Sequence, residues 1–530
     1  MASTTVAGSQ GFSVSRPAPS PWLIAVSVML ATFMEVLDTS IASVALPYIA
    51  GSLSATNDEA TWVLTSYLVA NAVILPASTW FSRKFGRKRF LITCIAIFTV
   101  SSFLCGAATS LWMILLARAV QGAGGGALQP LSQSILLESF PPDKRGMALA
   151  VFALGVVVAP VLGPTLGGYL TDTYSWRWAF YINIPIGIFA ILMILRFVED
   201  PPYIKNAKPG KIDGIGLGLL AVWLGALQII LDKGQEDDWF GANWIRWTTA
   251  LLVITFIAFI VREFTHDEPL VDLRVFRHRN FRIGCILIAI FGGALYGLIT
   301  LLPLFYQELL GYTAYAAGWA VSPRGIGAIM ALPIIGILTA KVDNRWLIAA
   351  GFCMFAISSL GFGQVTLEIS QWSFLWAIVL SGFGTGSIFV PLSTTAVAGL
   401  PNEEIGNASG LYNLFRNVGG SIGISLVNTI VARHAQLHQN EMVHSLAATD
   451  PAFQNQLHQL QQYLYTQGYG PVEAMRKAYA LIGGELSAQA LLWSYVDDFR
   501  YMALACFACI PIVFFLKKTV GRKGAQSVGH

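Results

Sequence analysis

Long apolar segments restrict the possible folds of this chain of 530 residues more than any other feature. Fourteen runs are each about as long as the roughly 20 apolar residues that a helix needs to cross a bilayer. Each run is continuously apolar rather than alternating, which favours helices over a β-barrel. The runs are residues 22–47, 60–81, 90–108, 111–137, 147–170, 178–197, 213–232, 244–264, 281–306, 315–339, 346–366, 372–398, 409–431 and 493–516.

The charge content agrees with this pattern. Only 12% of the residues are charged, about half of the usual share in a soluble domain. This excludes a soluble enzyme and a disordered chain. The net charge of +4 is too small to indicate a nucleic-acid partner. We therefore expect an all-α polytopic membrane protein with 14 transmembrane helices.

The basic residues indicate the orientation of the chain, because Lys and Arg concentrate in cytoplasmic loops. Dense clusters lie within residues 83–89, 262–282 and 517–523. With fourteen spans, all three clusters fall on the same side as the N-terminus. We expect both termini to be cytoplasmic.

The spacing of the runs predicts two six-helix bundles plus an inserted helix pair. Residues 432–490 form one long external segment, which is either a docking surface for a periplasmic partner or a passive connector. The expected organisation is a disordered cytoplasmic tail (1–20), an N-terminal bundle (21–200), the inserted pair with its linkers (201–275), a C-terminal bundle (276–516, including 432–490) and a cytoplasmic tail (517–530).

Charged side chains inside the first and fourth runs are the main candidates for chemistry, since such charges are costly in a bilayer. Glu35 and Asp38 are three residues apart and so share one helical face. Two neighbouring carboxylates at low dielectric favour proton binding by at least one of them. Arg118 stays charged and needs a partner. Either acid could supply it, although a structural Asp38 and a carbonyl-bonded Arg118 are open alternatives.

The fifth run carries a dense block of glycine and proline, residues 155–168. Small residues allow close helix contact, and prolines bend a helix whose neighbours can compensate. Gly163, Pro164, Gly167 and Gly168 therefore indicate a packed, bent helix that suits a rocking gate.

Several motifs that resemble catalytic or metal sites are better explained by helices. Residues 419–423 match G-x-S-x-G but lie inside an apolar run rather than at a strand–helix elbow. No P-loop motif is present in the sequence. His434 and His438 are four apart and could weakly hold a metal, but a solvated helix face explains them more simply. We expect no enzyme activity, no cofactor and no metal site.

Five motifs resemble those of the major facilitator superfamily, and within it the fourteen-helix drug:proton antiporters of the EmrB/QacA type, closest to EmrB. They are residues 37–47, 116–122, 155–168, 176–187 and 227–234. The resemblance covers about residues 22–516. It implies alternating access, proton coupling through Asp38 and Arg118, and a location in the bacterial cell inner membrane. It also implies a periplasmic membrane-fusion adaptor and an outer-membrane channel as partners.

One loop departs from the family pattern. After the second helix, the family has Gly and Asp where this chain has Thr79 and Arg83, while Gly86 and Arg87 remain as expected gating residues. The departure puts an Asp-based cytoplasmic gating contact in doubt.

The implied function is proton-coupled multidrug efflux of hydrophobic or amphipathic toxic compounds. A dedicated exporter of one native metabolite, such as a siderophore or fatty acid, is the alternative. A membrane enzyme that uses Ser421, or a sensor, is a hypothesis from a functional class other than transporters. Expected substrate-binding residues are Tyr67, Gln129, Gln133, Phe389 and Asn413; Arg324 and Arg416 lie in the tenth and thirteenth runs with no assigned role.

Overall fold

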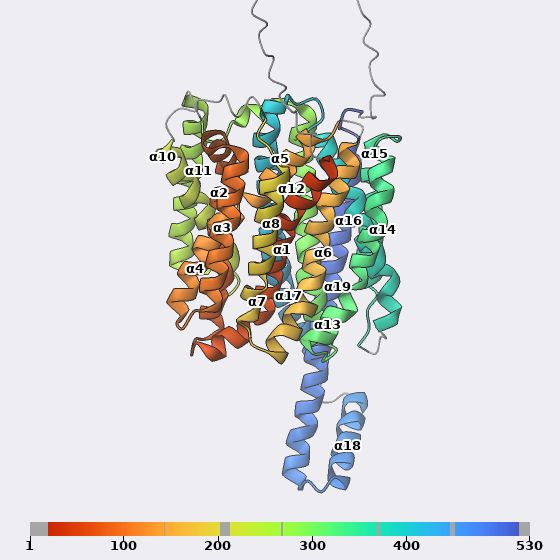
Figure 1. Ribbon diagram of the computed structural model, residues 1–530. Helices are drawn as coiled ribbons and strands as arrows, with labels where there is room; N and C mark the ends of the chain where they lie inside the picture. Colours follow the sequence, from red (N-terminus) through yellow and green to blue (C-terminus); the bar gives the residue numbers. More distant parts are fainter. Residues whose placement is uncertain are drawn as a thin grey trace, which may run out of the picture.

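The computed structural model describes residues 20–141, 144–201, 213–266, 269–367, 371–445 and 451–518. The expected tails fall almost wholly outside these ranges, as does most of the linker at 202–212. The described chain forms a bundle of long, roughly parallel helices, with a helical extension leaving one end (Figure 1). Helix α1 begins, and helix α19 ends, at the opposite end of the bundle (Figure 1).

The helices follow the order of the apolar runs. The first half contains α1 (Pro21–Ser52), α2 (Asn57–Phe85), α3 (Arg87–Gly106), α4 (Leu111–Gly125), α5 (Leu128–Ser139), α6 (Arg145–Thr173), α7 (Trp178–Tyr181) and α8 (Asn183–Phe197). The inserted part contains α10 (Gly214–Lys233), η1 (Trp239–Gly241) and α11 (Asn243–Thr265). The second half contains η2 (Leu273–Arg277), α12 (Arg279–Glu308), α13 (Ala314–Val321), α14 (Pro323–Leu338), α15 (Asn344–Phe362), η3 (Gln371–Phe374), α16 (Leu375–Ala396), α17 (Asn402–Ser445), α18 (Pro451–Thr466) and α19 (Pro471–Val513).

Among the described residues, 11 helices are long and apolar enough to cross a membrane, or 12 when the two parts of the bent α6 count as one span. Helices α17 and α19 also run through the bundle, where they pack against α12 and each other. Both carry polar side chains within their apolar stretches, such as Arg416 on α17 and Asp498 on α19, so they are less uniformly apolar than the other helices. The architecture is therefore consistent with fourteen spans.

Local sequence sets where several helices begin. Thr56 and Glu59 form a reciprocal capping box at the start of α2. Gly86, with a φ of 85°, separates α2 from α3 in a conformation that favours glycine. A Cβ there would also lie 2.9 Å from Asp200 Oδ2, and the other oxygen of this carboxylate, Oδ1, accepts the Lys88 backbone N–H.

The inserted helix α10 packs against helices of both halves, α2 and α17. Asp232 of α10 accepts a hydrogen bond from Thr65 of α2. Gln228 of α10 donates to Ser421 Oγ of α17 at 3.0 Å. Ser421, which lies in the G-x-S-x-G match, is thus a helix-packing residue.

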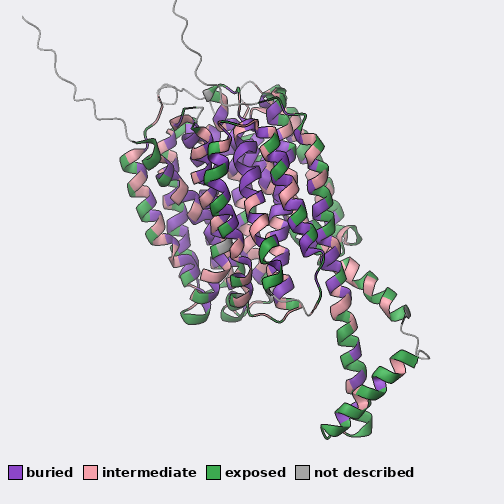
Figure 2. Ribbon diagram, turned by 90° about the vertical axis from the view of Figure 1, so that its right-hand side faces the viewer, coloured by how far each residue is buried: buried purple, intermediate pink, exposed green. Residues whose placement is uncertain are grey.

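The described part of the segment at 432–490 is mostly helical. Helix α17 extends beyond the bundle to Ser445, and α18 folds back along the outer part of α19 (Figure 1). Leu457 and Leu464 of α18 pack on a strip of α19 that includes Ala474 and Ala478. Most other residues of the extension are exposed or half-buried (Figure 2).

Candidate functional site

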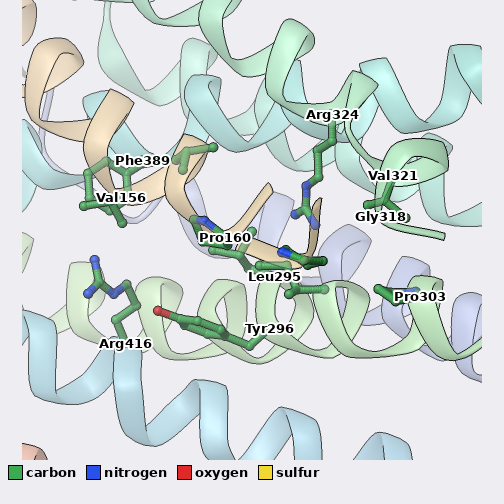
Figure 3. Close-up of a pocket in the computed structure, with 13 residues that line it drawn as sticks. Val156, Pro160, Leu295, Tyr296, Pro303, Gly318, Val321, Arg324, Phe389 and Arg416 are labelled. Atoms are coloured by element: carbon green, nitrogen blue, oxygen red, sulfur yellow. The ribbon is translucent and has the colours of Figure 1, made fainter. Parts of the chain in front are cut away.

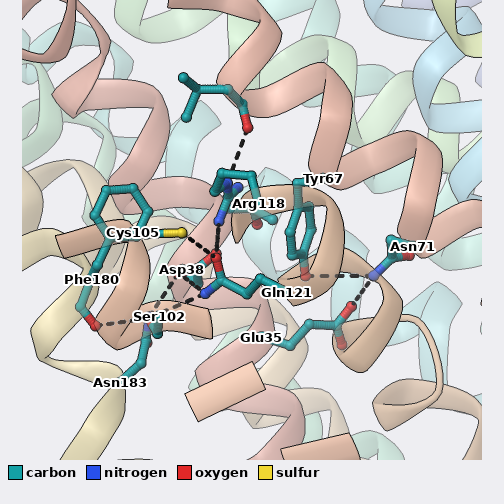
Figure 4. A network of polar contacts seen from close by, with 12 residues as sticks. Glu35, Asp38, Tyr67, Asn71, Ser102, Cys105, Arg118, Gln121, Phe180 and Asn183 are labelled. Atoms are coloured by element: carbon teal, nitrogen blue, oxygen red, sulfur yellow. Dashed lines mark hydrogen bonds and ion pairs between the residues drawn. The ribbon is translucent and has the colours of Figure 1, made fainter. Parts of the chain in front are cut away.

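A buried ion pair joins the first and fourth apolar runs. Arg118 Nη1 of α4 donates to Asp38 Oδ2 of α1 at 2.5 Å, and neither side chain is exposed. The guanidinium also donates to the Val63 carbonyl at 3.0 Å and to Gln121 Oε1 at 2.8 Å. Arg118 therefore bonds to the carboxylate and to a carbonyl at the same time (Figure 4).

Amide groups hold the other oxygen of the same carboxylate. Asp38 Oδ1 accepts from Gln121 Nε2 at 2.9 Å and from Asn183 Nδ2 at 2.7 Å. Both amides also donate to Ser102 Oγ, at 3.2 and 2.9 Å. This network fixes the orientation of the Asp38 carboxylate.

Glu35 is equally buried, but its environment differs. Its Oε1 accepts from Asn71 Nδ2 at 3.0 Å, while Oε2 has no hydrogen-bond partner among the described residues. In the part of the chain that the structure describes, no cation forms an ion pair with Glu35, although Arg416 and Asp38 lie near enough to interact electrostatically. A buried carboxylate without a paired cation is costly, and Glu35 differs in this from Asp38, which pairs with Arg118.

Tyr67 lies between the two acids rather than in a cavity. The Arg118 guanidinium stacks over its ring, 4.2 Å from the centroid. Its hydroxyl accepts from Asn71 Nδ2 at 3.5 Å, and Asn71 in turn binds Glu35 (Figure 4). Tyr67 and Asn71 thus connect the Asp38–Arg118 pair to Glu35.

Three of the other expected substrate residues join the two halves of the bundle. Gln129 of α5 accepts a hydrogen bond from Arg416 of α17. Asn413 of α17 donates to Gln133 Oε1 of α5 at 2.6 Å. All of these side chains are buried.

A pocket of about 680 Å³ of empty space, part of it open to solvent, lies between α6 and helices of the second half. Phe389 lines it, as expected. Apolar side chains supply most of the remaining wall, with contributions from Val156, Val157, Pro160, Pro164, Leu295, Tyr296, Ile299, Pro303, Gly318 and Val321.

Two arginines complete the wall of this pocket. Arg324 of α14 and Arg416 of α17 are each 1% exposed. Arg324 Nη1 and Nη2 have no hydrogen-bond partner among the described residues, and the same holds for Arg416 Nε and Nη1. Figure 3 shows both guanidinium groups reaching toward the pocket from different helices. The pocket therefore combines an apolar wall with unsatisfied positive charge.

The glycine-rich part of α6 lies against α1 at one point and the second half at another. A Cβ on Gly163 would lie 2.1 Å from Ser40 Oγ, so only glycine permits this approach of α6 to α1. Gly167 faces Ile41 of α1, whereas Gly168 faces Tyr315 of α13. The helix bends by 42° between Pro160 and Leu162, just before Pro164.

Residues on either side of the junction between α2 and α3 make further contacts. Arg87 Nη1 pairs with Glu138 Oε2 of α5 at 2.7 Å. Arg83, which replaces the family's Asp, has its Nη2 donating to the Glu403 carbonyl of α17 at 3.0 Å. A contact between the halves therefore exists here without the Asp.

Sequence reasoning missed the amides Asn71, Gln121 and Asn183. Each is a lone polar residue at a buried position, where an unpaired amide would be costly. That cost was the available signal. The sequence also offered no reason to assign a role to Arg324 and Arg416, because the apolar runs do not show that both side chains reach one pocket.

Two halves of bundled helices, a central pocket and a buried acid–base cluster define a polytopic membrane transporter. The family model described as Major Facilitator Superfamily matches residues 28–424, and the chain belongs to this family.

Individual relatives match almost end to end. The chain is 37% identical over 510 residues to "Multidrug export protein EmrB" of Escherichia coli (strain K12), covering 96% of this chain and 98% of the relative. It is 36% identical over 496 residues to "Fatty acid resistance protein FarB" of Neisseria gonorrhoeae, covering 93% and 96%. The solved proton:xylose symporter XylE superposes with a TM-score of 0.58 at 14% identity, covering 94% and 97%, which shows the shared fold.

Proposed function

We propose that this chain is a proton-coupled multidrug efflux transporter that exports hydrophobic and amphipathic compounds by alternating access. The observation that carries the proposal is the fully buried Asp38–Arg118 pair, with the uncompensated Glu35 beside it. Such groups inside a membrane bundle mark proton or ion pathways. The similarity to multidrug export proteins over the whole chain supports the export function.

Glu35 is the proposed proton carrier, and the Asp38–Arg118 pair is the proposed coupling element. A proton entering from outside binds Glu35 and removes an uncompensated buried charge. Loss of this charge alters the electrostatic interaction of Glu35 with Arg416, and Arg416 also lines the pocket. Substrate binding at the pocket and proton binding at Glu35 thus act on shared groups, as coupling requires.

We place the protein in the bacterial inner membrane with both termini cytoplasmic. The basic clusters support this orientation through the positive-inside rule. The helical extension formed by the outer parts of α17 and α19 with α18 then lies in the periplasm. Its length and its exposed polar surface suit contact with a membrane-fusion adaptor, which in turn meets an outer-membrane channel.

The test is transport of a fluorescent dye into everted membrane vesicles under an imposed proton gradient. We expect Glu35→Gln and Asp38→Asn each to lower gradient-driven transport at least about tenfold. A loss of 1.4 kcal/mol in coupling free energy already corresponds to that factor. Collapsing the gradient should stop transport by the unmodified protein.

Glu263→Gln is the matched control. Glu263 is also a buried acid in an apolar helix, but it lies in α11 and accepts the Val271 backbone N–H at 3.0 Å. Its neutralisation should leave coupling intact. Transport that continues after the gradient is collapsed would refute proton coupling.

A dedicated exporter of a long-chain carboxylate is the second candidate, and the two pocket arginines favour it. An unpaired guanidinium in an apolar wall binds a carboxylate strongly, while the wall accepts an alkyl chain. The similarity to a fatty acid resistance protein points the same way. Arg324→Gln should then lose transport of a long-chain fatty acid while keeping transport of a cationic dye. Equal losses for both compounds would contradict this candidate.

A further inference from the structure

Two histidines and one aspartate converge where the external extension leaves the bundle. His434 and His438 lie four residues apart on α17, so their side chains share one face. Asp497 faces them from α19. His434 Nδ1 and His438 Nε2 each lie 2.9 Å from the same Asp497 oxygen, Oδ2.

We propose that His434, His438 and Asp497 form a binding site for a divalent transition-metal ion of the zinc type. The three ligand atoms all lie within 4.8 Å of one another. Zinc binds imidazole nitrogen and carboxylate oxygen at about 2.0–2.2 Å, which places neighbouring ligand atoms of a tetrahedral site roughly 3.3 Å apart. The present geometry reaches that arrangement with side-chain shifts below about 1 Å.

The donor set decides the class of metal. Two imidazoles and one carboxylate suit Zn²⁺, Co²⁺, Ni²⁺ or Cu²⁺, whereas Mg²⁺ and Ca²⁺ prefer all-oxygen sites. Three protein ligands leave a fourth position for water. The side chains are 20–26% exposed, so an ion can reach them from solvent.

The surroundings leave room for a cation. Arg500 also pairs with Asp497, but it approaches the other oxygen, Oδ1, at 3.9 Å and is half exposed. Its repulsion is therefore screened by solvent. The Tyr501 ring lies edge-on to His434, with the ring centroids 5.9 Å apart, and restrains that imidazole.

The position of the site suggests its effect. Helices α17 and α19 run together through the bundle and diverge in the extension (Figure 2). A metal ion at their junction would cross-link the two helices and fix the direction of the extension. Binding would therefore couple external metal concentration to the geometry of this surface, and this holds independently of the transported substrate.

The test uses the full-length protein, free of any histidine tag, in detergent, with Co²⁺ as a spectroscopic probe. We expect one equivalent of Co²⁺ to give the visible absorption of a low-coordinate site, and Zn²⁺ to displace it. His434→Gln, His438→Gln and Asp497→Asn should each weaken binding at least about tenfold, since even changes to groups behind the ligands cost roughly 10–100-fold.

His444→Gln and His458→Gln are the matched controls, because both histidines are exposed on the same extension. They should bind Co²⁺ as the unmodified protein does. Asp497→Asn retains the shape and a hydrogen-bond acceptor, so it separates loss of a ligand from loss of folding. If the unmodified protein binds no Co²⁺, or if the ligand variants bind it as well as the controls, the cluster is only a hydrogen-bonded His–Asp contact and the proposal is wrong.

Discussion

At the scale of single residues, the buried Asp38–Arg118 pair joins α1 to α4 and is also the proposed coupling element. Removing one partner leaves an unpaired buried charge, which costs about 3–5 kcal/mol. We therefore expect Arg118→Met to lower the thermal stability of the detergent-solubilised protein strongly. The double variant Asp38→Asn with Arg118→Met removes both charges and should recover most of that stability.

Transport measurements distinguish the contribution of the Asp38–Arg118 pair to stability from its proposed role in coupling. Neither the single nor the double variant should show gradient-driven dye uptake, because the double variant has lost the coupling charges. Thermal denaturation and vesicle transport are measured on the same preparations. A double variant that transports normally would show that the pair serves folding alone.

The sequence predicted the charged members of this site but not their arrangement. The cost of burying charge singles out Glu35, Asp38 and Arg118 without any structure. That Asp38 rather than Glu35 meets Arg118 depends on the rotation of α1 against α4, which a run of apolar residues does not specify. The supporting amides, Asn183 among them, come from other helices and need the tertiary fold to be recognised.

At the scale of helices, the approach of α6 to α1 depends on Gly163. We expect Gly163→Ala to destabilise the protein by roughly 1–3 kcal/mol and to impair transport, because its Cβ would overlap Ser40 and force the helices apart. Thermal denaturation and dye uptake are again the measurements.

Gly218 provides the comparison, since a Cβ at this position on α10 would meet nothing within 4 Å. Gly218→Ala should be neutral or slightly stabilising, because alanine favours the helix by about 1 kcal/mol over glycine. If the two variants behave alike, close packing of α6 on α1 is not what Gly163 provides.

Hydropathy predicted the helical runs but not their interruptions. The single run at 111–137 is two helices, α4 and α5, separated near the glycines at 124–126. The runs at 178–197 and 315–339 likewise contain two helices each, α7 with α8 and α13 with α14. The apolarity of a run indicates that it is buried in lipid, whereas an interruption of the helix depends on local backbone contacts. Hydropathy therefore does not predict where a helix is interrupted.

At the scale of the whole molecule, the two halves touch near both ends of α6, with the pocket between these contacts. Near the beginning of α6, a Cβ on Gly336 of α14 would lie 3.2 Å from the Cβ of Ala150. Near its end, Gly168 packs against Tyr315 of α13. Alternating access requires that one of these contacts opens while the other stays closed, so that the pocket is accessible from one side at a time.

The contact between Gly168 and Tyr315 can be locked chemically. A Cβ on Gly168 would lie 4.0 Å from the Cβ of Tyr315, within the roughly 3.5–4.5 Å that a disulfide requires. We expect the double variant Gly168→Cys with Tyr315→Cys to form this disulfide on oxidation and to lose transport, with recovery on reduction. Mass spectrometry of the linked peptides measures the cross-link, and each single variant controls for oxidation alone. Complete cross-linking with undiminished transport would mean that α6 and α13 never separate, and the opening would then have to occur between other helices.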